Sequence, residues 1–289
     1  MRIAYAVLVH RNPEQFGRLI DALCYRAKNV EIFVHVDRKS LQEPFCNAVA
    51  VASRPLVHFV DRRIKVNWGG YSVVRATLAL LREITMKQSR FDYVILLSGQ
   101  GYPIKSYEFI DNFITRNAGR EHIQYSRIPD PEWDINDRYE RYHYFDICGN
   151  KLGWHLSRIV GRLLPVKRRI PYGIIPHAGS QWWGLTIKCV EYILEYVARY
   201  SLYDRFFRYT FVPDEMYFHS IIANSPFSEF VTGESLTHVE WDSEKSRPKI
   251  IRLEDLNRLL DSKKLFARKF DIAEDCQVLD ALKSAIESA

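Results

Sequence analysis

Tyr93-Val-Ile-Leu-Leu-Ser-Gly-Gln-Gly-Tyr-Pro-Ile-Lys-Ser106 is the stretch of sequence that decides the fold. Its first five residues are apolar, too few for a free-standing helix, and they predict a strand buried on both faces. The run then breaks at Ser98-Gly-Gln-Gly101. In an open α/β sheet, the loop at the carboxyl end of a central strand is where ligands bind. We therefore interpret this loop as a candidate ligand site in which Lys105 could meet an anion; a tight strand-to-helix turn is the plainer alternative.

The first half of the chain alternates between strand and helix patterns. They are a strand at 3–9, a helix at 13–27, a strand at 30–36, a short strand at 55–60, a helix at 72–85 and the strand at 93–97. Parallel strands joined by right-handed helical crossovers give this order. We expect a single α/β domain over residues 1–289, with a mostly parallel central sheet flanked by helices. Residues 1–120 would be its nucleotide-binding half and 121–289 its acceptor and catalytic half.

The second half is less regular. Residues 121–178 are rich in proline and tyrosine, and we expect a long, ordered loop there. Regular patterns return further on: helices at 187–200, after Pro213, at 253–261 and at 273–287, and a strand at 230–239.

Composition narrows the classes of function. The 289 residues are 47% hydrophobic and 26% charged, which is an ordinary globular balance. A net charge of +6 favours anionic ligands or an anionic surface, but no nucleic-acid motif accompanies it. The basic residues cluster at 158–169 and at 247–269. The first cluster is a candidate peripheral contact with anionic lipid, although a solvated basic face is the plainer interpretation.

The cysteines and the N-terminus bear on location. The five cysteines are far apart and form no C-x-x-C pair, which favours free thiols in a reducing compartment. The apolar run at the N-terminus is too short for a membrane span and is interpreted as the first strand. We expect a cytoplasmic protein.

Polar and aromatic residues follow the predicted strands. Asp37 closes the second strand, at the same sheet edge as the 98–106 loop, and an acidic residue there can accept hydrogen bonds from a ribose or base. A helix N-cap is the structural alternative. Trp68 stands beside Gly69-Gly70 before a helix and could stack on a base or sugar, or simply belong to a helix entry capped by Ser72.

Charged residues of the second half could carry chemistry. Glu215 follows Pro213-Asp214 at a helix start, where acidic residues suit the helix dipole. A carboxylate at such a junction can also act as a general base toward a sugar hydroxyl. The basic tail could stabilise a pyrophosphate leaving group without a metal. No D-x-D, H-E-x-x-H, P-loop, G-x-G-x-x-G or G-x-S-x-G motif occurs.

In their order along the chain, these segments resemble the core-2/I-branching β-1,6-N-acetylglucosaminyltransferase family, glycosyltransferase family 14, which includes the protein xylosyltransferases. The resemblance lies in the segments Ile3–His10, His35–Ser40, Trp68–Ser72, Leu97–Ser106, Gly179-Ser180, Pro213–Glu215 and Leu265–Asp271.

The resemblance implies a GT-A-like fold, a UDP-sugar donor, inversion at the anomeric carbon and no metal or other cofactor. By position it implies that Glu215 is the catalytic base. It implies donor contacts from Leu8, Val9, His10, Asp37, Arg38, Trp68, Gly179, Ser180 and Trp182. It implies diphosphate contacts from Lys269 and from Arg247 or Lys249, and acceptor contacts from Trp241 and from Arg138 or Arg141.

Two departures from the family pattern matter. Gly101 stands where the family usually has an acidic residue. The chain also lacks the signal anchor, stem and disulfide cysteines of the animal members, which suggests a compact bacterial type. We expect transfer of N-acetylglucosamine from its UDP-sugar to a glycan or glycolipid hydroxyl. UDP-xylose is the alternative donor, and Gly101 motivates a second alternative, a catalytically silent protein that binds a sugar nucleotide or glycan.

Overall fold

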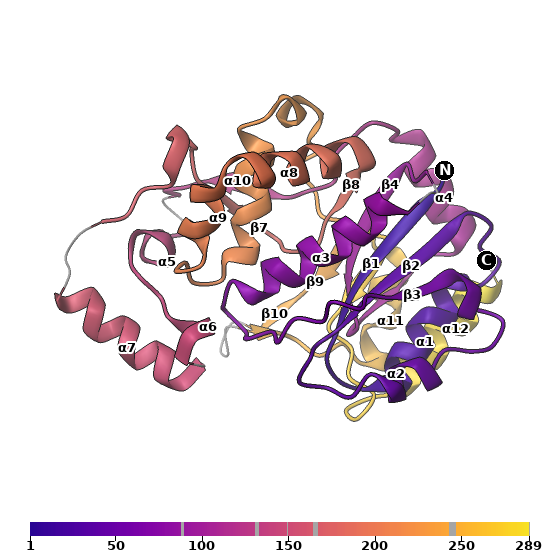
Figure 1. Ribbon diagram of the computed structural model, residues 1–289. Helices are drawn as coiled ribbons and strands as arrows, with labels where there is room; N and C mark the ends of the chain where they lie inside the picture. The colour runs from indigo at the N-terminus through magenta and orange to yellow at the C-terminus, as the bar shows by residue number, and fades with distance from the viewer. Residues whose placement is uncertain (88–89, 131–132, 149, 164–166, 243–246, 289) are drawn as a thin grey trace.

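The computed structural model describes residues 1–289 except 88–89, 131–132, 149, 164–166, 243–246 and 289 (Figure 1). Within the described residues, five strands form the central sheet, in the order β3 (Val57–Phe59), β2 (Val30–Val36), β1 (Ile3–Val9), β4 (Tyr93–Ser98) and β8 (Gly184–Thr186). The first four strands are parallel, and β8 runs antiparallel to β4. The predicted α/β fold with a mostly parallel sheet is confirmed.

Helices cover both faces of this sheet (Figure 1). Because side chains alternate along a strand, Ala4 and Ala6 join one buried cluster while Tyr5 and Val7 join the other. The helices are α1 (Pro13–Cys24), α2 (Glu43–Asn47), α3 (Ser72–Met86), α4 (Tyr107–Arg116), α5 (Asn136–Glu140), α6 (Phe145–Cys148), α7 (Asn150–Leu163), α8 (Ile187–Arg199), α9 (Ser201–Phe207), α10 (Tyr217–Ala223), α11 (Leu256–Asp261) and α12 (Gln277–Ser288).

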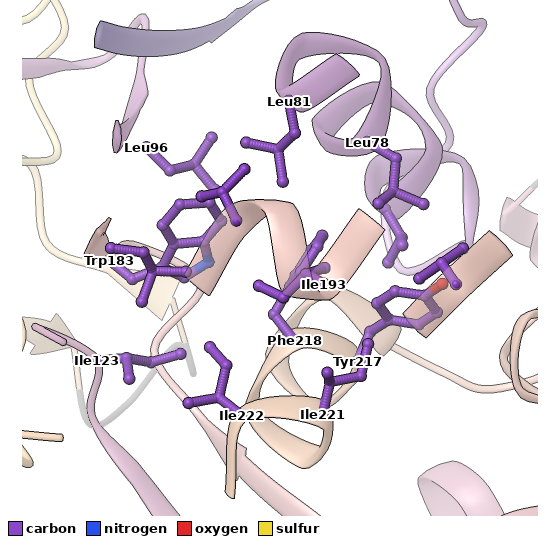
Figure 2. Packing of buried hydrophobic residues seen from close by; sticks show 14 of the residues in the cluster. Leu78, Leu81, Leu96, Ile123, Trp183, Ile193, Tyr217, Phe218, Ile221 and Ile222 are labelled. Atoms are coloured by element: carbon purple, nitrogen blue, oxygen red, sulfur yellow. The ribbon is translucent and has the colours of Figure 1, made fainter. Parts of the chain in front are cut away.

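Helix α10 is held in the first of these clusters. Figure 2 shows Phe218 and Ile222 of α10 beside Ile193 of α8 and Trp183, with Leu81 of α3 above them. Each of these side chains is at most 1% exposed, so the helix is surrounded by close packing. The short 3-10 turn η3 (Pro213–Glu215) leads directly into α10, and the core therefore fixes where Glu215 stands.

A second, three-stranded sheet joins the loop after β4 to the C-terminal part of the chain. Its order is β5 (Gly101–Pro103), β12 (Phe266–Arg268) and β9 (Thr237–Val239). β12 pairs antiparallel with β5 and parallel with β9. The segment 98–106, interpreted from sequence as a ligand loop, is therefore partly the strand β5. Its pairing with β12 brings Arg268 to the edge of the central sheet.

Three sequence predictions are corrected. Residues 121–178 are not one long loop, because they include β6 (Tyr125–Arg127), β7 (His177–Gly179) and the helices α5 to α7. The strand predicted at 230–239 is confined to β9, since a 3-10 turn ends at Phe230 and Gly233 adopts a left-handed φ of 72°. The last helix begins at Gln277 rather than 273 because Asp275 accepts hydrogen bonds from the amides of its first residues.

Two further observations concern cysteine and membrane spans. The described cysteines Cys24, Cys46, Cys189 and Cys276 are all free thiols. Throughout the described ranges, no helix combines the length and the apolar composition that crossing a bilayer requires.

Candidate active site

The carboxyl ends of β1, β2 and β4 meet at one edge of the sheet, as predicted. The amide of Gly99 donates to the carbonyl of Leu8 (2.9 Å), and the amide of Asp37 donates to the carbonyl of Val9 (2.8 Å). A Cβ at Gly99 would lie 2.6 Å from Cγ1 of Val9. Only glycine therefore lets the backbone at position 99 approach the end of β1 this closely. The predicted donor residues at positions 8–10 and 37–38 therefore stand side by side.

Asp37 is buried and organises the loop after β2. Its Oδ1 accepts hydrogen bonds from the amides of Lys39 (2.9 Å) and Val66 (3.3 Å). Arg63, which sequence reasoning missed, donates to the carbonyls of Val36 (3.1 Å) and Asp37 (2.8 Å). Arg38 remains exposed. Asp37 is thus a loop-organising residue at the predicted ligand edge rather than a helix cap.

The C-terminal segment 268–271 lies against this edge. Gln15 and Gln100, both buried, donate through their Nε2 atoms to the carbonyl of Phe270 (3.1 and 3.2 Å). The amide of Phe270 donates to the carbonyl of Gln100 (2.9 Å), and Arg11 pairs with Asp271 (2.7 Å). These contacts span about 170 to 260 positions of sequence and attach the basic tail to the ends of β1 and β4.

Lys269 lies among other cations at this edge. Partial burial lowers its pKa, and Arg11, Arg268 and Arg247 lower it further. The pKa of His10 is lowered by burial and by some of the same neighbours. Clustered cations that depress one another's pKa form a strong site for a polyanion, because a bound phosphate relieves their repulsion.

Lys249, the second candidate for the diphosphate, has carboxylate partners. Its Nζ lies 3.2 Å from Asp255 and 4.0 Å from Glu240. Lys105 likewise donates to the carbonyl of Leu260 and lies over the ring of Phe109, so it is directed away from the loop in which an anion was expected. Arg247 is therefore the better placed of the two alternatives.

Glu215 stands at the other side of the cations. Its Oε2 accepts a hydrogen bond from Nη1 of Arg138 at 2.7 Å, and both side chains are partly buried. The turn that carries Glu215 is bound to the Trp68 loop, because the amide of Val212 donates to the carbonyl of Gly69 (2.9 Å). The ring of Phe211 meets exposed Trp68 edge-on, with centroids 5.8 Å apart. The structure thus brings together two segments that the sequence only suggests separately.

Arg268, which the sequence placed only among the basic residues of the tail, connects Glu215 to the cation cluster electrostatically. Its guanidinium lies over the ring of Trp182, 4.8 Å from the centroid. Burial lowers the pKa of Arg268 to about 10, against the opposing influence of Glu215 and Asp214. Among the described residues, Nε of Arg268 and Oδ1 of Asp214 are buried without a hydrogen-bond partner. Buried polar groups left without a partner mark places where water or a ligand can bind.

Gly101, where the family pattern has an acidic residue, lies directly opposite Arg268 in the β5–β12 pairing. Side chains of directly opposed residues project from the same face of a sheet. A carboxylate at this position would therefore face Arg268. Its replacement by glycine removes a neighbour of Arg268 and leaves Glu215 and Arg138 in contact.

Helix α10 holds the segment 179–182, which is predicted to border the donor sugar. Nε2 of the fully buried His219 donates to the carbonyl of Ser180 (2.8 Å), and Oγ of Ser180 accepts from the amide of Trp182 (3.3 Å). Gly179 lies so close to the carbonyl of Gln124 that a Cβ would collide with it. The close packing of β6 against β7 is therefore sufficient to require glycine at position 179.

The acceptor residues lie further out. Trp241 is exposed in β10 (Trp241–Asp242), which pairs antiparallel with β11 (Arg247–Pro248). Arg141 is exposed and pairs with Asp137 (2.9 Å), whereas Arg138 contacts Glu215. No group of three or more His, Cys, Asp or Glu side chains in the described part of the chain is arranged to hold a metal ion.

Asp214 gives a testable dependence of stability on pH. Burial, and then the adjacent Glu215, raise its pKa from 3.8 to about 7. Between pH 4 and 7 the folded protein keeps a proton that the unfolded chain has lost, so the free energy of unfolding should fall as the pH rises. At about 1.4 kcal/mol per pKa unit, the expected loss is on the order of 4 kcal/mol. Over pH 4.5 to 8, urea unfolding should show the free energy of unfolding of the wild type declining by about this amount relative to that of Asp214→Asn.

Comparison of the wild type with Asp214→Asn isolates the contribution of Asp214 to the pH dependence of stability. His35, His122 and His219 have pKa values lowered by burial to about 4, and they contribute stability that rises with pH. Because both proteins share these histidines, only the difference between the two profiles is attributed to Asp214. Parallel profiles would contradict the raised pKa.

Comparisons with known proteins show which proteins this chain is similar to. The chain is 27% identical over 305 residues to xylosyltransferase 2 of Rattus norvegicus and 26% identical over 308 residues to xylosyltransferase 1 of the same species. Both alignments cover 98% of this chain but only 33% and 35% of the relatives, so the chain spans about a third of the length of the curated relatives it matches. These relatives are glycosyltransferases.

The family follows from a match to a family model. The core-2/I-branching enzyme family model matches residues 3–260, which is most of the chain. The chain belongs to the core-2/I-branching enzyme family.

Solved structures give weaker similarities. Mouse xyloside xylosyltransferase 1 in its apo form is 12% identical, with 91% of this chain and 97% of that chain covered and a TM-score of 0.39. The galactosyltransferase LgtC with donor and acceptor sugar analogs is 9% identical, with 98% and 95% covered and a TM-score of 0.42.

Proposed function

We propose that the protein is an inverting, metal-independent glycosyltransferase of the cytoplasm. It would move N-acetylglucosamine from its UDP-sugar to a hydroxyl of a glycan or glycolipid. The observation that carries the proposal is that Glu215 and the buried Arg268 interact electrostatically, and that Arg268 directly precedes Lys269. A base for the acceptor and positive charge for a leaving diphosphate therefore lie next to each other, as a direct displacement requires.

The proposed step needs only groups of this chain and the two substrates. The acceptor oxygen attacks the anomeric carbon from the side opposite the diphosphate, which inverts the configuration. Its proton passes to Glu215, and the bond between the anomeric carbon and the phosphate oxygen breaks with its electrons on UDP. Arg138 holds Oε2 of Glu215, so Oε1 is the oxygen that would take the proton. Arg268 and Lys269 would stabilise the charge on the departing diphosphate.

The surrounding residues fit the parts of a UDP-sugar. His10, Asp37 and Arg38 lie where β1 and β2 end, and they would hold the nucleoside. Trp68 is exposed and available for stacking. Ser180 and Trp182 would border the sugar, with Trp182 placed under the Arg268 guanidinium. Trp241 and Arg141 would contribute on the acceptor side.

UDP-xylose is the second candidate donor. It is favoured by the names of the curated relatives, which are xylosyltransferases. Calorimetric titration with UDP, UDP-N-acetylglucosamine and UDP-xylose, each with excess EDTA and again with manganese, separates the possibilities. EDTA-insensitive binding of one UDP-sugar would support the proposal and name the donor. Binding that requires manganese would overturn metal independence, and absence of UDP binding in both conditions would favour a silent protein.

Lys269→Ala should weaken UDP binding by at least about tenfold, because a hydrogen bond to a charged group contributes about 1.5–3 kcal/mol. The same titration measures the change. Lys264→Ala is a matched control, since Lys264 pairs with Glu234 (3.2 Å) away from the cation cluster, and its binding should match the wild type. A dissociation constant unchanged in Lys269→Ala would remove this lysine from the diphosphate site.

A further inference from the structure

Helices α6 and α7 form an arm at the edge of the molecule, far from the central sheet (Figure 1). The arm is attached firmly at one end. Asp146 of α6 accepts hydrogen bonds from the amide and Oγ of Ser72 (both 2.6 Å) at the start of α3. Helix α7 packs through its small residues: Oγ of Ser157 accepts from the amide of Tyr144 (3.1 Å), and a Cβ at Gly153 would come within 2.8 Å of the Tyr144 carbonyl.

The apolar side of α7 faces solvent instead of the core. Leu152, Ile159 and Leu163 are 62%, 54% and 73% exposed. Their spacings of seven and four place them on one stripe of the helix, about a quarter to a third of a turn away from the packed face of Gly153 and Ser157. Ile147 on α6 is a further exposed apolar residue of the arm. An exposed stripe of large apolar residues on an attached helix is typical of an interaction surface.

The charged residues in the sequence of α7 and of the segment that follows it are all basic. Residues 150–170 contain six lysines and arginines and no aspartate or glutamate. Arg168 is buried and donates to the carbonyls of Arg141 (2.9 Å) and Tyr209 (2.7 Å), so it belongs to the fold. Lys167 pairs with Glu140 (2.7 Å), so its charge is also partnered within the fold.

An exposed apolar stripe in a segment whose charged residues are all basic is typical of a helix that lies in the plane of an anionic membrane. We propose that the α6–α7 arm docks on anionic lipid, with Leu152, Ile159 and Leu163 at the boundary between head groups and acyl chains. A second copy of the chain is a poorer occupant, because pairing two such arms would bring their like charges together.

The arm is close to the proposed catalytic edge. Phe145 of α6 stacks on Phe211 with centroids 4.8 Å apart, and Phe211 is four residues before Glu215. Docking through the arm would therefore hold Glu215 near the bilayer surface. If the proposed function holds, docking implies that the acceptor is a lipid-linked sugar. The docking itself does not depend on the proposed function.

Vesicle flotation tests the proposal without any sugar nucleotide. The intact protein should float with vesicles of phosphatidylcholine and phosphatidylglycerol, much less with phosphatidylcholine alone, and less as salt is raised. The double variant Ile159→Glu, Leu163→Glu should lose at least about tenfold in lipid affinity, since both changes remove apolar contact and add negative charge. Leu41→Glu combined with Met86→Glu is the matched control, because both residues are 80% exposed elsewhere, and it should float like the wild type.

Several outcomes would overturn the proposal. One is failure of the wild type to float with either kind of vesicle, and another is equal flotation with both. A third is a loss of lipid affinity in the Leu41→Glu, Met86→Glu control as large as that in the Ile159→Glu, Leu163→Glu variant. Gel filtration gives one more: a wild-type dimer that the Ile159→Glu, Leu163→Glu variant dissociates would make a second copy the occupant. UDP binding, and transfer to a water-soluble acceptor, should be unchanged in this variant. Failure of docking is thereby distinguished from failure of the proposed enzyme activity.

Discussion

Replacement of Glu215 by glutamine is expected to slow glycosyl transfer by about 10²–10⁴-fold, the usual contribution of a general base. Glutamine keeps a side-chain oxygen that can accept the Arg138 hydrogen bond seen at 2.7 Å, so the turn before α10 should stay in place. It cannot take the proton of the acceptor hydroxyl. UDP binding should therefore be nearly unchanged while turnover collapses. Rate measurements with saturating donor, together with UDP titration, separate the two effects.

The control for this experiment is Glu229→Gln, the same chemical change at an exposed position. It should leave both turnover and UDP binding unaltered. Turnover of Glu215→Gln at the wild-type level would exclude Glu215 as the base. Loss of UDP binding along with turnover would point instead to a structural role for the Arg138–Glu215 pair.

The parts of the fold predicted well from sequence are those with a strong local pattern. The strands at 3–9 and 30–36 have the predicted bounds, and the 93–97 strand is longer by one residue. Buried parallel strands are continuous apolar runs, so their limits are readable. Because parallel strands end at one edge, the proximity of Leu8, Asp37 and the 98–101 loop also followed from the sequence.

The connection between the tail and the sheet could not be predicted in this way. It depends on Gln15 and Gln100, whose side chains bond to Phe270, and glutamine has no sequence pattern that indicates a partner more than a hundred residues away. Helices α6 and α7 were missed for a different reason. The exposed stripe of α7 does not face the core, so its periodicity was not separated from the surrounding basic and aromatic residues.

Arg268 shows most clearly what the structure adds. From sequence, Arg268 was grouped with the basic tail and only Lys269 was given an individual role, yet Arg268 is the residue that lies over Trp182 and interacts electrostatically with Asp214 and Glu215. Its position results from two pairings at once, with β5 on one side and β9 on the other. An antiparallel and a parallel pairing of short strands cannot be read from three residues of sequence.

Substitution of Arg268 by methionine should therefore have an effect that depends on pH. At pH 8, where Asp214 is ionised, losing the buried cation should lower the free energy of unfolding by about 3–5 kcal/mol, because a buried charge is left without compensation. At pH 5, Asp214 is protonated, since its pKa is raised to about 7. Arg138 still pairs with Glu215 there, so the expected cost falls to about 1–2 kcal/mol, that of an ordinary core substitution.

Urea unfolding of wild type and Arg268→Met at both pH values measures this difference, and methionine keeps most of the apolar stem over Trp182. Arg252→Met is the matched control, because Arg252 pairs with Glu274 at the surface and should cost less than about 1 kcal/mol at either pH. The same cost for Arg268→Met at pH 5 and pH 8 would mean that Arg268 acts through packing on Trp182. A cost confined to pH 8 would mean that its charge compensates the two neighbouring carboxyl groups, which is what a site that prepares Glu215 as a base requires.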